Sequence, residues 1–137
     1  MESKYLMKPF HILAAFSAVA VMAISTPAIA GPIQPYSVAA FKAAQKAGKP
    51  ILVDVHADWC PTCRRQAPTL VEISKDPAFS KLVIFKVDFD KQVKEREALN
   101  ARKQSTLIVY KGAVEKGRVT GITDRNDIRK FAAAALK

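Results

Sequence analysis

The sequence predicts a single α/β domain, and three observations lead to that fold class. The chain has 137 residues, of which 50% are hydrophobic, and this is the size and composition of one folded domain rather than of a disordered chain. Helical patterns alternate along it with short runs of β-branched and aromatic residues. It contains no internal repeat, no glycine- and serine-rich linker and no glycine-rich phosphate-binding loop.

The first thirty residues have the composition of a secretory signal peptide. Lys4 and Lys8 form a basic start, residues 12–24 form an apolar run, and a small-residue tail ends at Ala30. The apolar run is shorter than the roughly 20 residues that span a bilayer, so we expect cleavage after Ala30. The alternative is an uncleaved membrane anchor, since residues 12–30 could just cross a thin membrane.

The predicted organisation is therefore a signal peptide over residues 1–30 and one domain over residues 31–137. Such a chain works outside the cytoplasm, and we expect the periplasm. Its 22 Lys and Arg against 12 Asp and Glu give a net charge of +10, which suits acidic partners or an anionic surface. Because a charged face is most often only solvated, we predict no nucleic-acid partner from this charge.

Capping, periodicity and turn residues predict the elements of the domain. Pro68 lies inside the second predicted helix and is expected to kink it. In chain order the expected elements are a helix between Ser37 and Gly48, a strand at 51–55, a helix at 63–74, a strand at 82–88, a solvated helix at 91–102, a strand at 106–110 that forms a hairpin with a return strand at 118–120, and a final helix capped near Thr123 or Asp124.

The only two cysteines, Cys60 and Cys63, are spaced C-x-x-C between a predicted strand and a predicted helix. This number excludes a multi-disulfide scaffold and a four-cysteine zinc site. At a helix start the first sulfur lies beside unpaired backbone N–H groups, which favour the thiolate. We therefore expect Cys60 to be a solvent-accessible nucleophile and Cys63, one turn further on, to be the resolving thiol.

Two other interpretations of the cysteine pair stay open. A structural disulfide is one, although a bond that closes so short a loop removes little entropy from the unfolded chain. A metal site is the other, with Cys60, Cys63 and His56 as three ligands. Zinc usually takes a closed set of four ligands or an open catalytic geometry, so no metal is assigned to these residues.

The segment 53–63, which reads VDVHADWCPTC, resembles the active-site segment of the thioredoxin superfamily. The resemblance covers nearly all of the mature chain: the order of the elements is that family's order, and Pro68 matches its helix-kinking proline. It implies the thioredoxin fold, a central mixed sheet flanked by helices in one domain. The stretch from Ala57 to Cys60 is also similar to exported thioredoxin-like domains that carry electrons from a membrane relay.

The resemblance assigns roles to two charged residues near the cysteines. Asp54 matches the buried carboxylate that assists deprotonation of the second cysteine, and burial should raise its pKa towards neutrality. The alternative is a strand-end aspartate paired with backbone or a lysine. Lys86 matches the lysine near that carboxylate, with an outward-facing strand residue as the alternative.

A partner-binding surface is also implied. Trp59 resembles the tryptophan that flanks the first cysteine on this surface, with a pure core role as the alternative, and Pro61 and Thr62 lie between the two cysteines. Gln104 and Ser105 match the loop that faces the active site and pairs with an extended segment of the substrate. His56 stands where thioredoxins usually have an aromatic residue, and we interpret it as a packed histidine rather than a ligand or a proton shuttle.

The same loop contains the main departure from the family, because Ser105 replaces a cis-proline that precedes threonine. A cis bond before a residue other than proline costs about 2.5–4 kcal/mol, so we expect the bond between Gln104 and Ser105 to be trans. Partner affinity should then be lower and metal access to the sulfurs easier. Replacing Ser105 with proline should restore a cis turn and keep disulfide exchange intact.

The predicted function is that of a protein thiol–disulfide oxidoreductase that reduces disulfides of exported proteins. Asp54 and Lys86 follow the thioredoxin pattern and no helical domain is inserted, which favours reduction over oxidation. The chemistry needs no cofactor besides the Cys60–Cys63 pair, and an exported reductant needs a membrane electron relay as a partner. We expect a monomer. The alternatives are a metal-binding or metallochaperone module that uses the same thiols, and a disulfide oxidase or isomerase.

Overall fold

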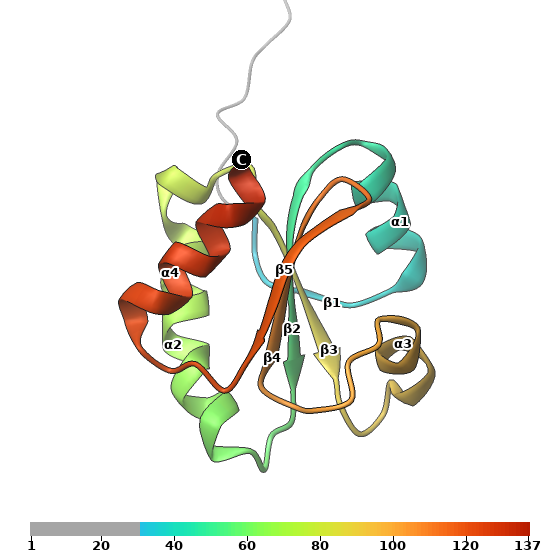
Figure 1. Ribbon diagram of the computed structural model, residues 1–137, viewed down its shortest axis with the longest axis vertical. Coiled ribbons are helices and arrows are strands. Elements are labelled where there is room, and N and C mark those ends of the chain that lie inside the picture. Colours follow the sequence, from blue (N-terminus) through green and yellow to red (C-terminus); the bar gives the residue numbers. More distant parts are fainter. Residues whose placement is uncertain (1–30) are drawn as a thin grey trace, which may run out of the picture.

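A mixed five-stranded sheet forms the centre of the protein (Figure 1). The computed structural model describes residues 31–137, so the predicted signal peptide lies outside the described residues. The strand order is β1-β3-β2-β4-β5, in which β1, β3 and β2 are parallel and β4 is antiparallel to both β2 and β5. The strands are β1 (Gln34–Pro35), β2 (Pro50–His56), β3 (Val83–Asp88), β4 (Thr106–Lys111) and β5 (Val114–Thr120).

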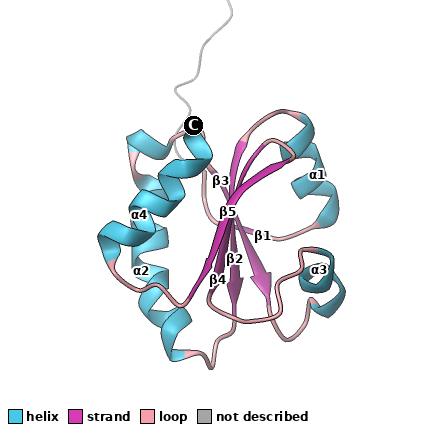
Figure 2. Cartoon of the chain, viewed as in Figure 1, coloured by secondary structure: helices cyan, strands magenta, loops and turns pink. Residues whose placement is uncertain are grey.

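Helices cover both faces of the sheet (Figure 2). Helices α1 and α3 lie on one face, and α2 and α4 lie on the other. The helices are α1 (Val38–Lys46), α2 (Pro61–Lys75), α3 (Val93–Ala98) and α4 (Arg125–Ala133), with 3₁₀ turns at Pro77–Phe79 and Ala134–Leu136. The predicted fold class, a central mixed sheet flanked by helices in one domain, is confirmed.

Strand β2 is central to both cores because all seven of its residues are buried. Ile51, Val53 and Val55 face the α1 side, where they join an aromatic cluster around Phe41. Leu52 faces the α2 and α4 side. Since side chains alternate along a strand, Asp54 and His56 share the face of Leu52 and point towards the helix that begins at the cysteines.

The structure differs from the sequence prediction at the short or exposed elements. Strand β1 was not predicted, because it has two residues and one of them is a proline. Helix α3 is shorter than the predicted helix at 91–102 and ends before Asn100, whose φ is 52°. The hairpin turn is tight at Gly112, with φ 56°, so β5 begins at Val114 rather than at residue 118.

Within residues 31–137, the helices are too short or too polar to cross a membrane.

Candidate active site

The two cysteines lie where strand β2 passes into helix α2. Cys60 is the N-cap residue of α2, and Pro61 is its first helical residue. Proline is tolerated there because the N–H of a first helical residue has no partner within the helix. The Cys60 Sγ accepts a hydrogen bond of 3.1 Å from the backbone N–H of Cys63. Both cysteines are free thiols. The Cys60 sulfur therefore faces the amide groups of the first helical turn, where negative charge is favoured.

Both thiols are buried, and this corrects the expectation that Cys60 is open to solvent. The exposed fraction is 2% for Cys60 and 1% for Cys63. They pack together with Ala57 and the half-buried ring of Phe89, which cover them. A partner disulfide must therefore approach the Cys60 sulfur closely, or the turn before α2 must yield to it.

The environment of Cys63 keeps its thiol protonated. Burial, and then a hydrogen bond with the Cys60 side chain, raises the pKa of Cys63 to about 11. The backbone groups of Ala57 and Ser105 oppose this rise without cancelling it. At neutral pH Cys63 is therefore a poor nucleophile unless a base removes its proton.

Asp54 is a buried carboxyl group on the same face of β2, with 3% of the residue exposed. Burial raises its pKa to about 7, and the positive charge of Lys86 opposes that rise. Lys86 is the register partner of Asp54 on β3 and has an exposed side chain, so it lies beside the carboxylate and at the surface. Among the described residues, Asp54 Oδ1 has no hydrogen-bond partner, and no hydrogen bond joins Asp54 to Cys63.

His56 lies between two carboxyl groups. Its Nδ1 is 3.8 Å from Asp54 Oδ2, and its Nε2 is 3.3 Å from Asp58 Oδ1. The residue is buried, at 8% exposed, as expected for a packed histidine. Burial and then the charge of Lys86 lower the pKa of His56, while Asp58 and Asp88 oppose this. His56 is therefore a neutral imidazole at pH 7.

The imidazole of His56 does not join the two thiols in a metal-binding group. Among the described residues, no three side chains of His, Cys, Asp or Glu are arranged to hold a metal ion. The ligand set considered from the sequence, Cys60, Cys63 and His56, is therefore not assembled in residues 31–137.

Trp59 is the most prominent exposed side chain next to the cysteines. It is 56% exposed, so the alternative of a pure core role is wrong. Its Nε1 donates a hydrogen bond of 2.9 Å to Asp90 Oδ2, and its ring meets Phe89 edge-on at 6.4 Å. Pro61 is exposed and Thr62 is half-buried beside it. These contacts fix the indole at the surface without burying it.

The loop before β4 is held in a conformation that differs from the family pattern. The bond between Gln104 and Ser105 is trans, as predicted, since residues 31–137 contain no cis peptide bond. Ser105 has a φ of 55°, in the left-handed region, and its N–H donates 2.8 Å to the carbonyl of Val55. Proline fixes φ near −65° and has no N–H. The expectation that proline at this position would simply restore the family turn is therefore revised.

The comparisons with known proteins agree with this geometry. The family model described as Thioredoxin matches residues 33–134. The chain belongs to the thioredoxin family. Thioredoxin of Rickettsia bellii is 31% identical over 83 residues, which is 61% of this chain and 78% of that protein. Thioredoxin H-type of Brassica oleracea is 35% identical over 80 residues, which is 58% of this chain and 63% of that protein.

Solved structures in the thioredoxin family show the same fold. The chain is 42% identical to Trxlp from Edwardsiella tarda EIB202, with a TM-score of 0.72 and coverage of 74% of this chain and 98% of that one. Thioredoxin of Malassezia sympodialis is 26% identical, with a TM-score of 0.68 and coverage of 77% and 95%. The protein is thus a thioredoxin-like thiol–disulfide oxidoreductase whose two cysteines lie close together.

One residue of the thioredoxin-like site was missed from the sequence. Gln66 on α2 is 0% exposed, and its Nε2 donates 3.2 Å to the carbonyl of Ser105 and 2.9 Å to the carbonyl of Ile122. It joins the cysteine-bearing helix to the loops before β4 and after β5. The available signal was a polar residue one turn before Leu70 on the apolar face of a predicted helix.

Proposed function

We propose that this thioredoxin-like protein reduces disulfide bonds in exported proteins, with Cys60 as the attacking thiol and Cys63 as the resolving thiol. The observation that carries the proposal is the hydrogen bond from the Cys63 backbone N–H to the Cys60 Sγ at the N-terminus of α2. This donor, together with the helix dipole, stabilises negative charge on Cys60 rather than on Cys63. The redox chemistry uses the two thiols themselves and no cofactor.

The proposed reaction proceeds through a mixed disulfide. The Cys60 thiolate attacks one sulfur of the partner disulfide, which forms a Cys60–partner bond and releases the other partner sulfur as a thiolate. Cys63 then loses its proton and attacks the Cys60 sulfur. This attack forms the Cys60–Cys63 disulfide and breaks the Cys60–partner bond, so the second partner sulfur leaves as a thiolate. The two electrons that reduce the partner disulfide therefore come from the two thiols of the protein.

Asp54 is the proposed base for the second step. The pKa of Cys63 is about 11, so deprotonation needs an acceptor, and the pKa of Asp54 is about 7, so its carboxylate is available at neutral pH. No hydrogen bond joins the two groups within the described part of the chain, so the transfer uses a bridging water or a closer approach in the mixed disulfide. Lys86 beside Asp54 supports its ionised form.

The partner is proposed to dock across Trp59, Pro61 and Thr62 and against the loop of Gln104 and Ser105. Gln104 is the residue proposed to offer its backbone, because the Ser105 N–H donates to Val55 and the Ser105 carbonyl accepts from Gly121 and Gln66. The exposed indole supports docking here, since it offers a large rigid surface next to the first cysteine. The backbone of Ser105 lies close enough to the resolving thiol to influence the pKa of Cys63, which supports a place for that loop at the reacting sulfurs.

Trapping tests the assignment of the two cysteines. Cys63→Ser should accumulate mixed disulfides with a disulfide-containing protein, because the resolving attack is lost, whereas Cys60→Ser should form none at neutral pH. Adducts are counted on non-reducing gels and by mass spectrometry. If Cys60→Ser forms adducts as readily as Cys63→Ser, the assignment is wrong.

A redox titration tests the direction of transfer. We propose reduction because Asp54 and Lys86 are register partners in the thioredoxin pattern and the described residues contain no inserted helical domain. The Cys60–Cys63 couple should titrate near the roughly −270 mV of reducing thioredoxins. A potential near about −120 mV, that of a strong oxidant, would overturn the proposal in favour of a disulfide oxidase.

The proposed place of work is the periplasm, with a membrane relay as the electron donor and a monomeric reductant. Fractionation of cells that express the full chain, followed by mass spectrometry of its N-terminus, tests the location. A mature start at Gly31 in the periplasmic fraction is expected. An intact N-terminus in the membrane fraction would show that residues 1–30 are an uncleaved anchor. An intact N-terminus in the cytoplasm would show that the protein is not exported.

A further inference from the structure

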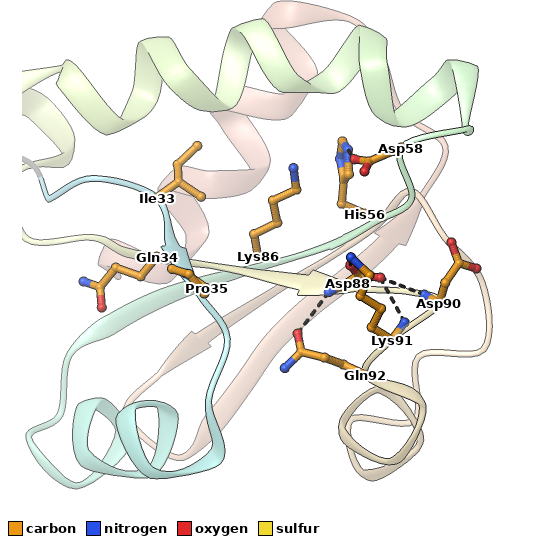
Figure 3. A pocket seen from close by; sticks show the side chains of 10 residues that line it. All are labelled: Ile33, Gln34, Pro35, His56, Asp58, Lys86, Asp88, Asp90, Lys91 and Gln92. Carbon is orange, nitrogen blue, oxygen red and sulfur yellow. Dashed lines mark hydrogen bonds and ion pairs between the residues drawn. The ribbon is translucent and has the colours of Figure 1, made fainter.

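A cavity of about 360 Å³ opens beside the end of β3, next to the buried base of the site (Figure 3). His56 at the end of β2, Asp58 in the turn that follows it and Lys86 on β3 are among the residues that line it. Asp54 is buried and does not itself line the cavity. A proton that leaves the Asp54 carboxyl therefore needs a group that reaches both the carboxyl and the cavity.

His56 is in the position to do this. On one side, its Nδ1 lies 3.8 Å from Asp54 Oδ2. On the other side, its Nε2 lies 3.3 Å from Asp58 Oδ1, and the Asp58 side chain is 95% exposed to solvent. The three side chains thus form a line from the interior to the surface, with an imidazole in the middle that can accept at one nitrogen and donate at the other.

We propose that His56 is a proton relay that connects Asp54 with the solvent at Asp58 during thiol–disulfide exchange. It acts through Asp54 and does not touch the sulfurs, so it is a positioning residue for the proton rather than a catalytic residue. The inference rests on the proposed role of Asp54 as the base for Cys63. The sequence alone favoured a merely packed histidine at this position.

The relay balances over one complete redox cycle. When Cys63 attacks, its proton goes to Asp54, then to His56 Nδ1, while the proton on Nε2 leaves to water at Asp58. When the Cys60–Cys63 disulfide is reduced again, Cys63 is the leaving sulfur. The proton on His56 Nδ1 passes to Asp54 and from Asp54 to Cys63, while Nε2 takes up a proton from water at Asp58, so the second half-reaction restores the original tautomer.

Charges around His56 set the conditions for this transfer. Asp54 and Asp58 face it from β2 and the turn that follows, and Lys86 and Asp88 face it from β3. Burial and Lys86 lower the pKa of the imidazole, so it is neutral and able to accept a proton at pH 7. The gap of 3.8 Å exceeds a hydrogen bond, so the ring or the carboxyl must move by about 1 Å for transfer.

The test separates the two chemical steps with an aromatic disulfide, 5,5′-dithiobis(2-nitrobenzoate). The reduced protein releases one coloured thiolate when Cys60 attacks and a second when Cys63 resolves the adduct, so stopped-flow absorbance gives both rates. In His56→Phe, which keeps a packed ring but cannot carry a proton, the second rate at pH 7 should fall at least about tenfold. The first rate should stay within about twofold.

His56→Ala supplies a readout that a purely structural role would not move. The cavity it leaves should admit free imidazole, and added imidazole should restore the second rate in a concentration-dependent way. Lys91→Gln is the matched control, because Lys91 lines the same cavity but pairs with Asp88, at 3.6 Å, and should change neither rate. A second rate in His56→Phe equal to that of the parent, or no rescue of His56→Ala by imidazole, overturns the relay.

Asp54→Asn distinguishes failure of the relay from failure of the proposed function. If Asp54→Asn slows the second step and the His56 variants do not, the base is correct and the relay is wrong. If Asp54→Asn leaves the second step unchanged, the base itself is wrong and the relay falls with it. Thermal unfolding of each variant shows that the measured rates belong to folded protein.

Discussion

At the scale of single residues, Asp54 links the chemistry of the site to the stability of the fold. Its carboxyl is almost fully buried, and one of its oxygens lacks a hydrogen-bond partner among the described residues. An ionised carboxylate in such a place is costly. The resemblance of the sequence to the thioredoxin superfamily predicted this burial, and the structure agrees.

The raised pKa of Asp54 predicts how stability changes with pH. Burial raises the folded-state pKa from 3.8 to about 7, so between these values the folded state holds a proton that the unfolded state has lost. The Asp54 contribution to stability is therefore complete below pH 4 and is lost as pH rises to about 7. In urea titrations at pH 8, the free energy of unfolding of Asp54→Asn should exceed that of the parent by up to about 4 kcal/mol. This difference should vanish near pH 4. A gain of equal size at both pH values would contradict the raised pKa.

Ser105 gives a second prediction, because its backbone conformation excludes the residue that the family usually has. With φ at 55° and its N–H bonded to Val55, this position cannot accept proline without rebuilding the loop. Ser105→Pro should lower the free energy of unfolding by roughly 3 kcal/mol in urea titrations. Ser105→Gly, which tolerates this φ, should stay within about 1 kcal/mol of the parent. Equal stability of the proline variant would show that the loop has a second conformation.

At the scale of elements, Gln66 controls how α2 and the Ser105 loop are held together. Replacing Gln66 with leucine removes the donor shared by the carbonyls of Ser105 and Ile122. We expect a loss of about 1–3 kcal/mol and a higher KM for protein disulfides, with little change towards a small disulfide that does not need the loop. Ser74→Ala is the control, since Ser74 bonds only within α2. A KM for protein disulfides equal to that of the parent would remove the positioning role.

The sequence predicted best the elements in which the pattern of apolar residues along the chain matches the residues that are buried in the structure. Strand β2 and helix α2 have a continuous apolar run and a clear start at the cysteines, and both lie within two residues of their expected bounds. The contacts of Ser105 and Gln66 could not be predicted, because they join residues 39 positions apart. The line from Asp54 through His56 to Asp58 depends on side-chain distances that a sequence does not contain.

At the scale of the whole molecule, the two thiols are buried beneath a surface that exposes the large aromatic side chain of Trp59. Trp59 is 56% exposed, whereas Cys60 is 2% exposed. The sulfur is therefore reached only by a partner that fits closely around it. Shape at this end of the molecule, more than intrinsic reactivity, should decide which disulfides are reduced.

Trp59→Ala tests this view of partner selection. The indole contributes one exposed hydrogen bond to Asp90 and an edge-on contact with Phe89, so the free energy of unfolding should change by no more than about 1 kcal/mol. Exchange with a folded protein disulfide should nevertheless slow by about tenfold or more, because the docking surface is lost. Steady-state rates with a protein and a small disulfide measure the difference. Equal slowing with both substrates would place the tryptophan in the chemistry rather than in docking.

The two edges of the sheet have a consequence for self-association. One edge, β1, has two residues and includes Pro35, which offers no N–H. The other, β5, is mostly exposed and carries Glu115, Lys116 and Arg118. Short edges, prolines and charges at an edge discourage the stacking of strands from separate molecules that leads to aggregates. Both edges of this sheet should therefore resist joining the strands of separate molecules into fibrils.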